Sequence, residues 1–140
     1  MTLKIKKLDK EVNIPKYACD GDAGFDLLAS KDFVIKKGEK GAVPTGIAVE
    51  IPKGYVGLIW DKSGLAIKNG LKTLGGVVDS GYRGEVMVGV INLGDSDYKF
   101  EKNHKVAQMI IQKAECVEIE EVETLSDTER GCGGFGSTGK

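Results

Sequence analysis

The chain of 140 residues is long enough for one domain with its own core, without disulfide or metal staples. Its 20 basic and 21 acidic residues leave a formal net charge of -1, which gives no reason to expect nucleic acid or an anionic membrane as a partner. Three cysteines without Cys-x-x-Cys spacing argue against a disulfide framework, and a single histidine argues against a histidine metal site and a Ser-His-Asp triad. No apolar run approaches the length of about 18 residues that a membrane span needs. These features predict a cytoplasmic protein.

Period-two alternation of apolar residues predicts a chain built mostly of short β-strands. The strand candidates, in chain order, are Leu3–Ile5, Phe33–Ile35, Ile47–Ile51, Val56–Trp60, Val86–Val90, Val106–Ile111 and Val117–Val122. Turn signals between them leave little room for long helices, so we expect an all-β barrel or sandwich. One short helix is expected from Ser63 to Asn69, with Ser63 as its N-cap and Gly70 as its stop.

The last eleven residues, Arg130 to Lys140, contain five glycines and no packing pattern. Before them, the stretch from Glu115 to Arg130 is acidic and passes from a strand pattern into turn residues. We therefore expect a single β domain at residues 1–129 and a flexible Gly-rich arm at residues 130–140. Open glycine backbone, an arginine, an aromatic ring and two hydroxyls could hold a nucleoside phosphate; a flexible tail without function is the alternative.

Only two of the 20 basic residues are arginines, and both lie beside glycine. A guanidinium group can bind phosphate through two parallel hydrogen bonds, so a scarce arginine next to open backbone is a candidate phosphate ligand. Arg130 has no local acidic partner except Glu129. Arg83 has Asp79 and Glu85 nearby, and we expect an ion pair with one of them.

Four further clusters of small and polar residues are not explained by packing. Asp22–Leu27 carries two carboxylates beside a glycine, and carboxylates near a triphosphate steady Mg²⁺ and its waters. Asp61–Ala66 offers a lysine, a hydroxyl and open N–H groups at a predicted helix start, which suits an anion. The alternatives are an ordinary Asp-rich turn and an ordinary capped turn. Lys105–Gln108 places a glutamine within an apolar strand, where it needs a hydrogen-bond partner if buried.

The fourth cluster, Gly75–Glu85, predicts a β-hairpin with a polar tip. Backbone groups along such a hairpin can bind the edge of a base, and Tyr82 can lie against a sugar. Asp79 can act as general base on a water molecule, a role that contributes on the order of 10²–10⁴ in rate.

Taken in chain order, the segments DAGFDL, DKSGLA, GGVVDSGYRGE, KVAQMII and RGCGGFGSTG resemble the five motifs of the trimeric deoxyuridine triphosphate nucleotidohydrolases, or dUTPases. The match covers nearly the whole chain, with conventional spacing. The resemblance implies a jelly-roll-like β-barrel and a homotrimer in which three subunits build each active site. It also implies Mg²⁺-dependent hydrolysis of dUTP to dUMP and pyrophosphate, which limits uracil incorporation into DNA and supplies dUMP for dTMP synthesis.

The resemblance also implies a role for each matching residue. Asp79 would deprotonate the water that attacks the α-phosphorus, Tyr82 would pack on the deoxyribose, and backbone groups around Gly76 and Met87 would bind uracil. Asp26 would act on Mg²⁺ through water, because the triphosphate holds the metal directly. The expected substrate-binding residues are Lys62, Ser63, Gly64, Gly76, Val77, Tyr82, Met87, Gln108, Arg130, Phe135, Gly136, Ser137 and Thr138.

Within the arm, the resemblance implies three contacts with the substrate. Arg130 would reach the γ-phosphate, and Phe135 would stack over uracil. Ser137 and Thr138 would close on the phosphates. A mobile arm of this kind would position the substrate and exclude water from the reaction.

Three positions depart from the family pattern. Lys62 stands where many members have arginine, which keeps the charge and loses the fork of donors. Asp61 stands where proline is frequent. Asn103-His104-Lys105 replaces the usual Gly-Asp-Arg before the strand that carries the glutamine.

Two alternatives to a dUTPase remain open. The first is the related dCTP deaminase, including its bifunctional form, which carries a catalytic glutamate on the strand after the hairpin; this chain has Gly89 in that stretch. The second is a β trimer that binds nucleotides without catalysis, which would be expected to lose the base or the arm. The sequence keeps both.

Overall fold

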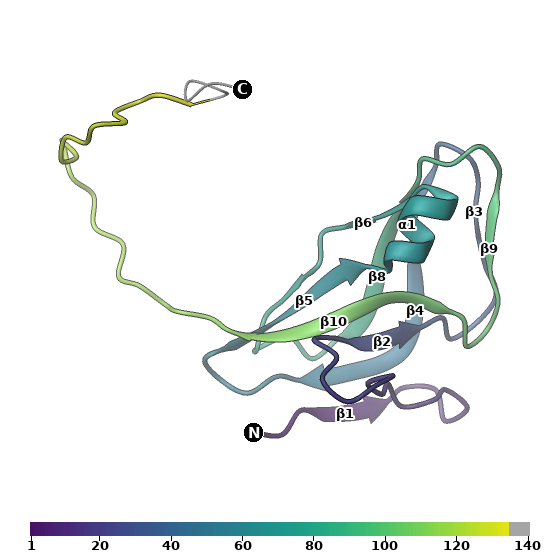
Figure 1. Cartoon of the computed structure of the whole chain (residues 1–140). Coiled ribbons are helices and arrows are strands. Elements are labelled where there is room, and N and C mark those ends of the chain that lie inside the picture. Colours follow the sequence, from purple (N-terminus) through teal and green to yellow (C-terminus); the bar gives the residue numbers. More distant parts are fainter. Residues whose placement is uncertain (135–140) are drawn as a thin grey trace.

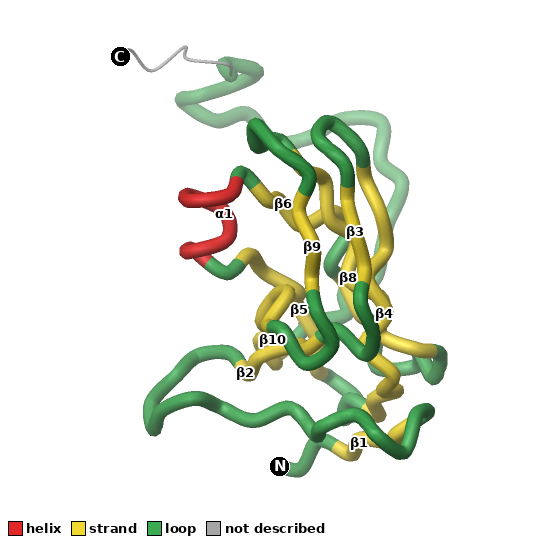
Figure 2. The backbone as a smooth tube through the Cα atoms, turned by 90° about the vertical axis from the view of Figure 1, so that its right-hand side faces the viewer, coloured by secondary structure: helices red, strands yellow, loops and turns green. Residues whose placement is uncertain are grey.

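Antiparallel strands form nearly all of the regular structure in the computed structural model, which describes residues 1–134 (Figure 1). The elements are β1 (Lys4–Lys7), β2 (Phe25–Leu28), β3 (Phe33–Ile35), β4 (Lys40–Glu50), β5 (Tyr55–Asp61), α1 (Ser63–Asn69), β6 (Leu71–Leu74), β7 (Val77–Val78), β8 (Glu85–Asn92), β9 (Tyr98–Phe100) and β10 (Lys105–Lys113). Two four-stranded sheets have the orders β1-β4-β8-β6 and β2-β10-β5-β7, and β3 pairs with β9 at the side of the molecule (Figure 2). The expectation of a jelly-roll-like, all-β fold is confirmed.

One hydrophobic core joins the two large sheets. On β8 the predicted alternation is observed, because Val86, Val88 and Val90 are all buried. Strand β5 contributes Ile59 from the facing sheet, and β10 contributes Met109. Each strand therefore turns one face toward the core and the other away from it, as period-two alternation requires.

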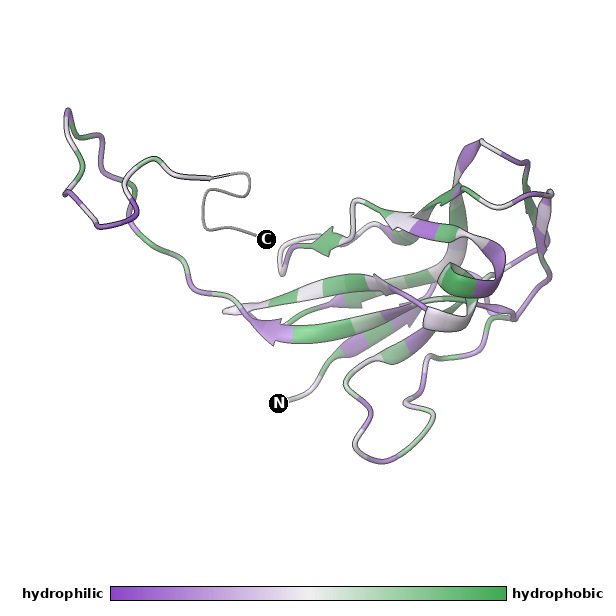
Figure 3. Cartoon of the chain, turned by 45° about the horizontal axis from the view of Figure 1, so that its top comes forward, coloured by the Kyte–Doolittle hydropathy of each residue, from purple (hydrophilic) through white to green (hydrophobic). Residues whose placement is uncertain are grey.

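Six of the seven predicted strand segments overlap observed strands, namely β1, β3, β4, β5, β8 and β10. Strands β2, β6 and β9 were not predicted, and each has only three or four residues. The strand predicted at Val117–Val122 is wrong: the chain there has no regular structure, and Val117 and Ile119 are 78% and 92% exposed. Figures 1 and 3 show the reason, because the segment after β10 runs away from the sheets, where no described strand lies beside it to complete a ladder.

Helix α1 spans the predicted residues, but its cap differs from the prediction. Lys62, in extended conformation, occupies the N-cap position, and no side chain caps the helix; Ser63 is already the first helical residue. The predicted stop is confirmed, because Gly70 adopts the left-handed conformation with φ of 68°. The turn then packs tightly on the next loop, where the Leu93 N–H donates a 2.9 Å hydrogen bond to the Gly70 carbonyl.

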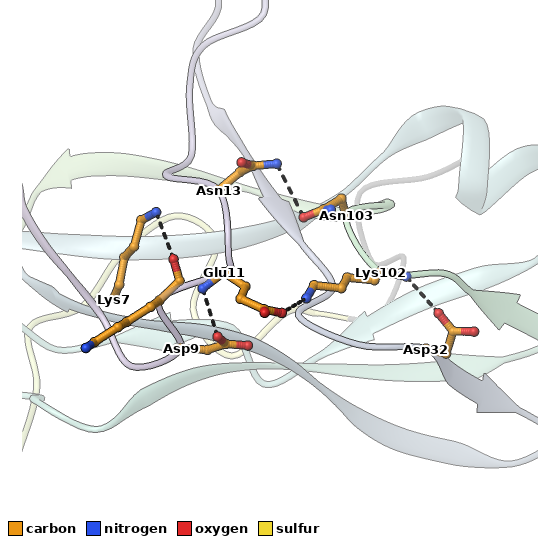
Figure 4. A network of polar contacts seen from close by, with 8 residues as sticks. Lys7, Asp9, Glu11, Asn13, Asp32, Lys102 and Asn103 are labelled. Atoms are coloured by element: carbon orange, nitrogen blue, oxygen red, sulfur yellow. Dashed lines mark hydrogen bonds and ion pairs between the residues drawn. The ribbon is translucent and has the colours of Figure 1, made fainter.

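A network of polar contacts fixes the turn that leads into β10 (Figure 4). Lys102 binds Glu11 through an ion pair of 2.8 Å, and its backbone N–H donates to Asp32 at 3.0 Å. Asn103 accepts a 3.4 Å hydrogen bond from Asn13 and has a φ of 68°, a conformation that asparagine tolerates better than most residues. The network therefore sets where β10 begins and also holds the N-terminal segment against it.

Residues 1–134 contain no helix that is both long and apolar enough to cross a membrane. The three thiols, Cys19, Cys116 and Cys132, are free and exposed.

We predict that Gly70→Ala lowers the free energy of unfolding by about 3 kcal/mol or more. A Cβ atom at this position would lie 2.6 Å from the Gly94 nitrogen and 2.8 Å from its Cα, so backbone would have to move in addition to the cost of a left-handed alanine. Urea unfolding at fixed protein concentration measures the change.

Gly54→Ala is the matched control. Gly54 also has a positive φ, +82°, but no atom within 4 Å of its Cβ position, so we expect only the conformational cost of about 1–2 kcal/mol. Equal losses for the two variants would contradict the role of the close backbone approach.

Candidate active site

Asp26 on β2 is a nearly buried carboxylate shared by two lysines. Its Oδ1 atom accepts from Lys62 Nζ at 2.5 Å, and its Oδ2 atom accepts from Lys105 Nζ at 2.7 Å. The Asp26 side chain is 9% exposed, whereas Lys62 and Lys105 are 29% and 53% exposed. The carboxylate therefore anchors two ammonium groups that still reach solvent, and Asp26 and Lys105 line a pocket of about 610 Å³.

Burial alone would raise the pKa of Asp26, but the hydrogen bonds and positive charges of Lys105 and Lys62 outweigh it and hold this pKa below its ordinary value. In return, the hydrogen bond and charge of Asp26 raise the pKa of Lys105. The Asp26 carboxylate is thus ionised at neutral pH, and the cluster combines one carboxylate with two lysines. An anion is the ligand that such a cluster favours.

Lys105 reaches Asp26 because of a β-bulge. The ladder between β2 and β10 pairs Lys105 with Leu28 and Ala107 with Leu27, so β10 holds one extra residue. In a regular ladder without the bulge, Lys105 would share the face of the buried Ala107, two residues along, because side chains alternate along a strand. Sequence reasoning did not include Lys105 among the site residues. The available signal was that Lys105 stands where the family usually has arginine, three residues before Gln108.

Asp61, where the family often has proline, ties β5 to β6. Its Oδ1 atom accepts from the Thr73 N–H and hydroxyl, both at 2.7 Å, and its Oδ2 atom accepts from Lys72 at 2.7 Å. Burial raises the pKa of Asp61, but these partners more than offset it and leave the pKa lowered. Asp61 is therefore a structural residue. Its backbone carbonyl also accepts a 2.9 Å hydrogen bond from the side chain of Gln108, which is the hydrogen-bond partner that this glutamine was expected to need.

Ser63 and Gly64 lie at the start of α1, next to Lys62, and both are exposed. A Cβ atom at Gly64 would meet nothing within 4 Å, so the backbone there is open. These two residues, Lys62 and Gln108 are brought together where β5 runs into α1, beside Asp26.

A second pocket, of about 200 Å³, gathers most residues of the fourth sequence cluster. Its lining is Ile59, Gly76, Val77, Val78, Asp79, Tyr82, Glu85, Val86 and Met87. Five of the predicted site residues are therefore neighbours in space: Gly76, Val77, Asp79, Tyr82 and Met87. The linings of this pocket and of the Asp26 pocket share no residue.

The β-hairpin predicted at Gly75–Glu85 is wrong, and the actual arrangement creates the pocket. Strand β7 pairs with β5, while β8 pairs with β4 and β6, so the two sides of the loop belong to different sheets. The ladder between β6 and β8 stops at Leu74 and Gly89. After it the chain crosses to β5, where the Gly76 carbonyl accepts a 2.7 Å hydrogen bond from the Ile59 N–H. Within residues 1–134, no strand pairs with β8 on this side at Met87, so a polar backbone edge faces the pocket.

Asp79 and Tyr82 lie on the loop between β7 and β8. Asp79 is exposed and lines the pocket, and its carbonyl accepts from the Tyr82 N–H at 3.1 Å. Arg83 does not form the predicted ion pair with Asp79 or Glu85 in the described residues. Its guanidinium instead donates to the carbonyls of Ser80 and Tyr82 at 2.7 and 2.9 Å, because the loop turns those carbonyls toward it.

A direct protein site for Mg²⁺ does not fit the part of the chain that the structure describes. Residues 1–134 contain no group of three His, Cys, Asp or Glu side chains that could hold a metal ion. Both oxygens of Asp26 already accept from lysine. The water-mediated contact predicted for Asp26 stays a prediction.

Arg130 lies in a local turn of the segment that follows β10. Its Nε atom donates to the Gly133 carbonyl at 2.9 Å, and the Gly131 N–H donates to the Thr128 carbonyl at 3.0 Å. The segment runs away from the two large sheets (Figures 1 and 3). Phe135, Gly136, Ser137 and Thr138 lie outside the described residues.

Fold and site define a jelly-roll-like β protein with a backbone edge, a carboxylate and a tyrosine in one pocket, and a separate cluster in which two lysines share the Asp26 carboxylate. The family model described as dUTPase matches residues 10–139. The chain belongs to the dUTPase family, a family of hydrolases.

The relatives match over nearly their full length. The deoxyuridine 5'-triphosphate nucleotidohydrolases of Clostridium tetani (strain Massachusetts / E88) and Nautilia profundicola are 47% and 49% identical, covering 99% and 100% of this chain and 97% and 100% of theirs. A solved structure of the dUTPase of Staphylococcus bacteriophage 80alpha with dUpNHpp has a TM-score of 0.93 at 30% identity and covers 99% of each chain.

We predict that Asp26→Asn lowers the free energy of unfolding by about 2 kcal/mol at pH 7, because two ammonium groups lose their counter-ion. A lowered folded-state pKa stabilises the fold above the unfolded carboxyl pKa of about 4, and this contribution is lost as pH falls through the folded value. The difference between wild type and variant should therefore shrink below about pH 4. Denaturant unfolding between pH 3 and 7 measures it.

Glu50→Gln provides the control, because Glu50 pairs with Lys4 at 2.7 Å but its side chain is 45% exposed. We expect a clearly smaller loss for this surface pair, because water and salt screen its charges. A loss for Asp26→Asn that matches the control, or that is unchanged at pH 3, would contradict the assigned electrostatic role.

Proposed function

We propose that this protein hydrolyses dUTP to dUMP and pyrophosphate. The observation that carries the proposal is the pocket in which Asp79 and Tyr82 lie beside the unpaired backbone edge of β8. These are the parts needed to bind a base, a sugar and an attacking water at one place. The family supports the same reaction, because the relatives found are named for it.

Within this pocket each group has a separate task. The backbone edge at Met87 and Gly76 binds the polar edge of uracil, and the ring of Tyr82 packs on the deoxyribose. Asp79 is exposed, so its carboxylate can hold a water molecule and accept its proton as the water attacks the α-phosphorus. The pocket supplies position and a base, which is most of what phosphoryl transfer requires.

The second group of residues binds the triphosphate. Lys62 and Lys105 supply positive charge at the Asp26 cluster, and the exposed backbone and hydroxyl at Ser63 and Gly64 supply neutral donors. Mg²⁺ enters as part of the substrate, bound to the triphosphate, since the described residues offer no ligand set of their own. Asp26 then acts on it only through water.

We propose a homotrimer with shared active sites. The two pockets have separate linings within one chain, which supports completion of each site by neighbouring chains. An apolar row crosses the outer face of the second sheet, where the register aligns Ile110, Leu58 and Val77, the last 68% exposed. Trp60, two residues along β5 from Leu58 and therefore on the same face, is 52% exposed. Apolar surface of this kind favours burial against another copy.

In the proposed trimer, residues 1–129 form the domain and residues 130–140 form an arm that closes over an active site. The segment before the arm leaves its own domain, which supports closure over another subunit (Figure 1). Arg130 would then bind the γ-phosphate and Phe135 would cover uracil.

The alternative of a dCTP deaminase has no support at Gly89. This residue lies inside the ladder between β6 and β8, and a Cβ atom there would lie 2.8 Å from the Leu74 carbonyl oxygen. A catalytic glutamate cannot be accommodated at this position without displacing backbone.

We predict that Asp79→Asn retains binding of dUpNHpp while turnover of dUTP falls by about 10²–10⁴. Pyrophosphate release from dUTP, dTTP, dCTP and UTP, with and without Mg²⁺, tests activity, and calorimetry tests binding. Hydrolysis by the wild type should be selective for dUTP. Retained turnover in the variant, or ammonia release from dCTP at a rate comparable to dUTP cleavage, would contradict the proposal.

We also predict that deleting residues 130–140 leaves the thermal midpoint within about 2 °C of the wild type. The same deletion should lower dUTP hydrolysis by about tenfold or more, because the proposed arm positions substrate and excludes water. Thermal unfolding and pyrophosphate release measure the two effects. Unchanged hydrolysis would show that these residues are a tail without a catalytic role.

A further inference from the structure

The ring of Tyr82 lies directly against Gly84, two residues further along the loop. A Cβ atom built on Gly84 would lie 2.6 Å from Cζ and 2.9 Å from Cε2 of Tyr82, and closer still to its hydroxyl oxygen. Real Cβ atoms do not approach other heavy atoms this closely. The ring therefore occupies space that exists only because residue 84 has no side chain.

Hydrogen bonds hold the ring in that space. The Tyr82 hydroxyl donates to the Glu85 carbonyl at 2.8 Å, so the ring bends back over the loop. Glu85 is itself fixed, because its Oε1 atom accepts from the Gly46 N–H on β4 at 2.7 Å. The ring is thus anchored through the loop to β4 of the first sheet.

We infer that Gly84 is a positioning residue for sugar selection, through the place it leaves for the Tyr82 ring. This inference rests on the proposed function, in which that ring packs on the deoxyribose. With the ring held against Gly84, its exposed face forms a fixed surface on which a sugar without a 2′-hydroxyl fits. A methyl group at position 84 would lift the ring away from this place and change the space left for the sugar.

Gly84→Ala is a clean perturbation of the ring. The φ of Gly84 lies outside the left-handed region, so alanine fits the backbone without conformational strain. The three nearest atoms that its Cβ would meet all belong to the Tyr82 side chain. Rotation of that side chain, 44% exposed, relieves the clash at lower cost than a backbone shift.

The same loop offers a matched control. Gly81 also has a φ outside the left-handed region, and nothing lies within 4 Å of its Cβ position. Gly81→Ala therefore adds the same methyl group to the same loop without touching the ring. Its effect on loop entropy should resemble that of Gly84→Ala, so the difference between the two variants reports the ring alone.

The test compares kcat and KM for dUTP and UTP in both variants, together with the Kd values for dUMP and UMP. We expect Gly84→Ala to lower kcat/KM for dUTP by about tenfold, and to lower the preference for deoxyribose in both measurements, while Gly81→Ala stays within about twofold of the wild type. In a Tyr82→Ala background, Gly84→Ala should have no further effect, because the ring through which it acts is gone.

Unchanged sugar preference in Gly84→Ala, or an equal loss in the Tyr82→Ala background, would overturn the inference. A thermal midpoint for Gly84→Ala that equals that of Gly81→Ala shows that folding is not the cause of any change. If the wild type binds dUMP in preference to UMP but hydrolyses no dUTP, the proposed function fails, while the Kd values still decide the role of Gly84.

Discussion

The carboxylate of Asp26 connects three parts of the chain that the fold must bring together. It lies on β2, accepts from Lys62 at the junction of β5 and α1, and accepts from Lys105 at the first residue of β10. A nearly buried carboxylate is costly unless it is paired, and two lysines on separate segments provide the pairing. The interaction therefore favours only those arrangements in which the helix start and the β10 bulge meet at one place.

That constraint extends outward from the cluster. Lys105 can reach Asp26 only if the bulge is present and β10 starts at the right residue, and the network around Lys102 and Asn103 sets that start (Figure 4). On the other side, Asp61 secures the end of β5 against β6, so Lys62 leaves the sheet at a fixed point. The departures from the family pattern at these positions thus form part of one consistent structure.

Sequence reasoning found the elements whose signal is local. The alternation at Val86, Val88 and Val90 predicted β8, and the glycine at position 70 predicted where α1 ends. It could not determine pairing, because register depends on contacts between distant segments. The wrong hairpin at Gly75–Glu85 has this cause: the local pattern was that of two strands and a turn, but the strands pair with different sheets. The role of Lys105 was missed for the same reason, since its partner lies on a distant strand. Val117 and Ile119 alternate as in a strand, but no strand within residues 1–134 pairs with this segment, so no strand forms there.

The end of the ladder between β6 and β8 has a consequence for how the protein can change over evolution. In the proposed site, base selectivity comes from backbone groups left open where pairing stops at Leu74 and Gly89, and not from the side chain of Met87. Such selectivity is tolerant of point mutation, because exchanging the side chain leaves the backbone groups in place. It is vulnerable to a different kind of change. Two more residues of strand pairing would extend the ladder to Met87 and cover the open edge, so the length of β6 decides whether that edge can bind a base.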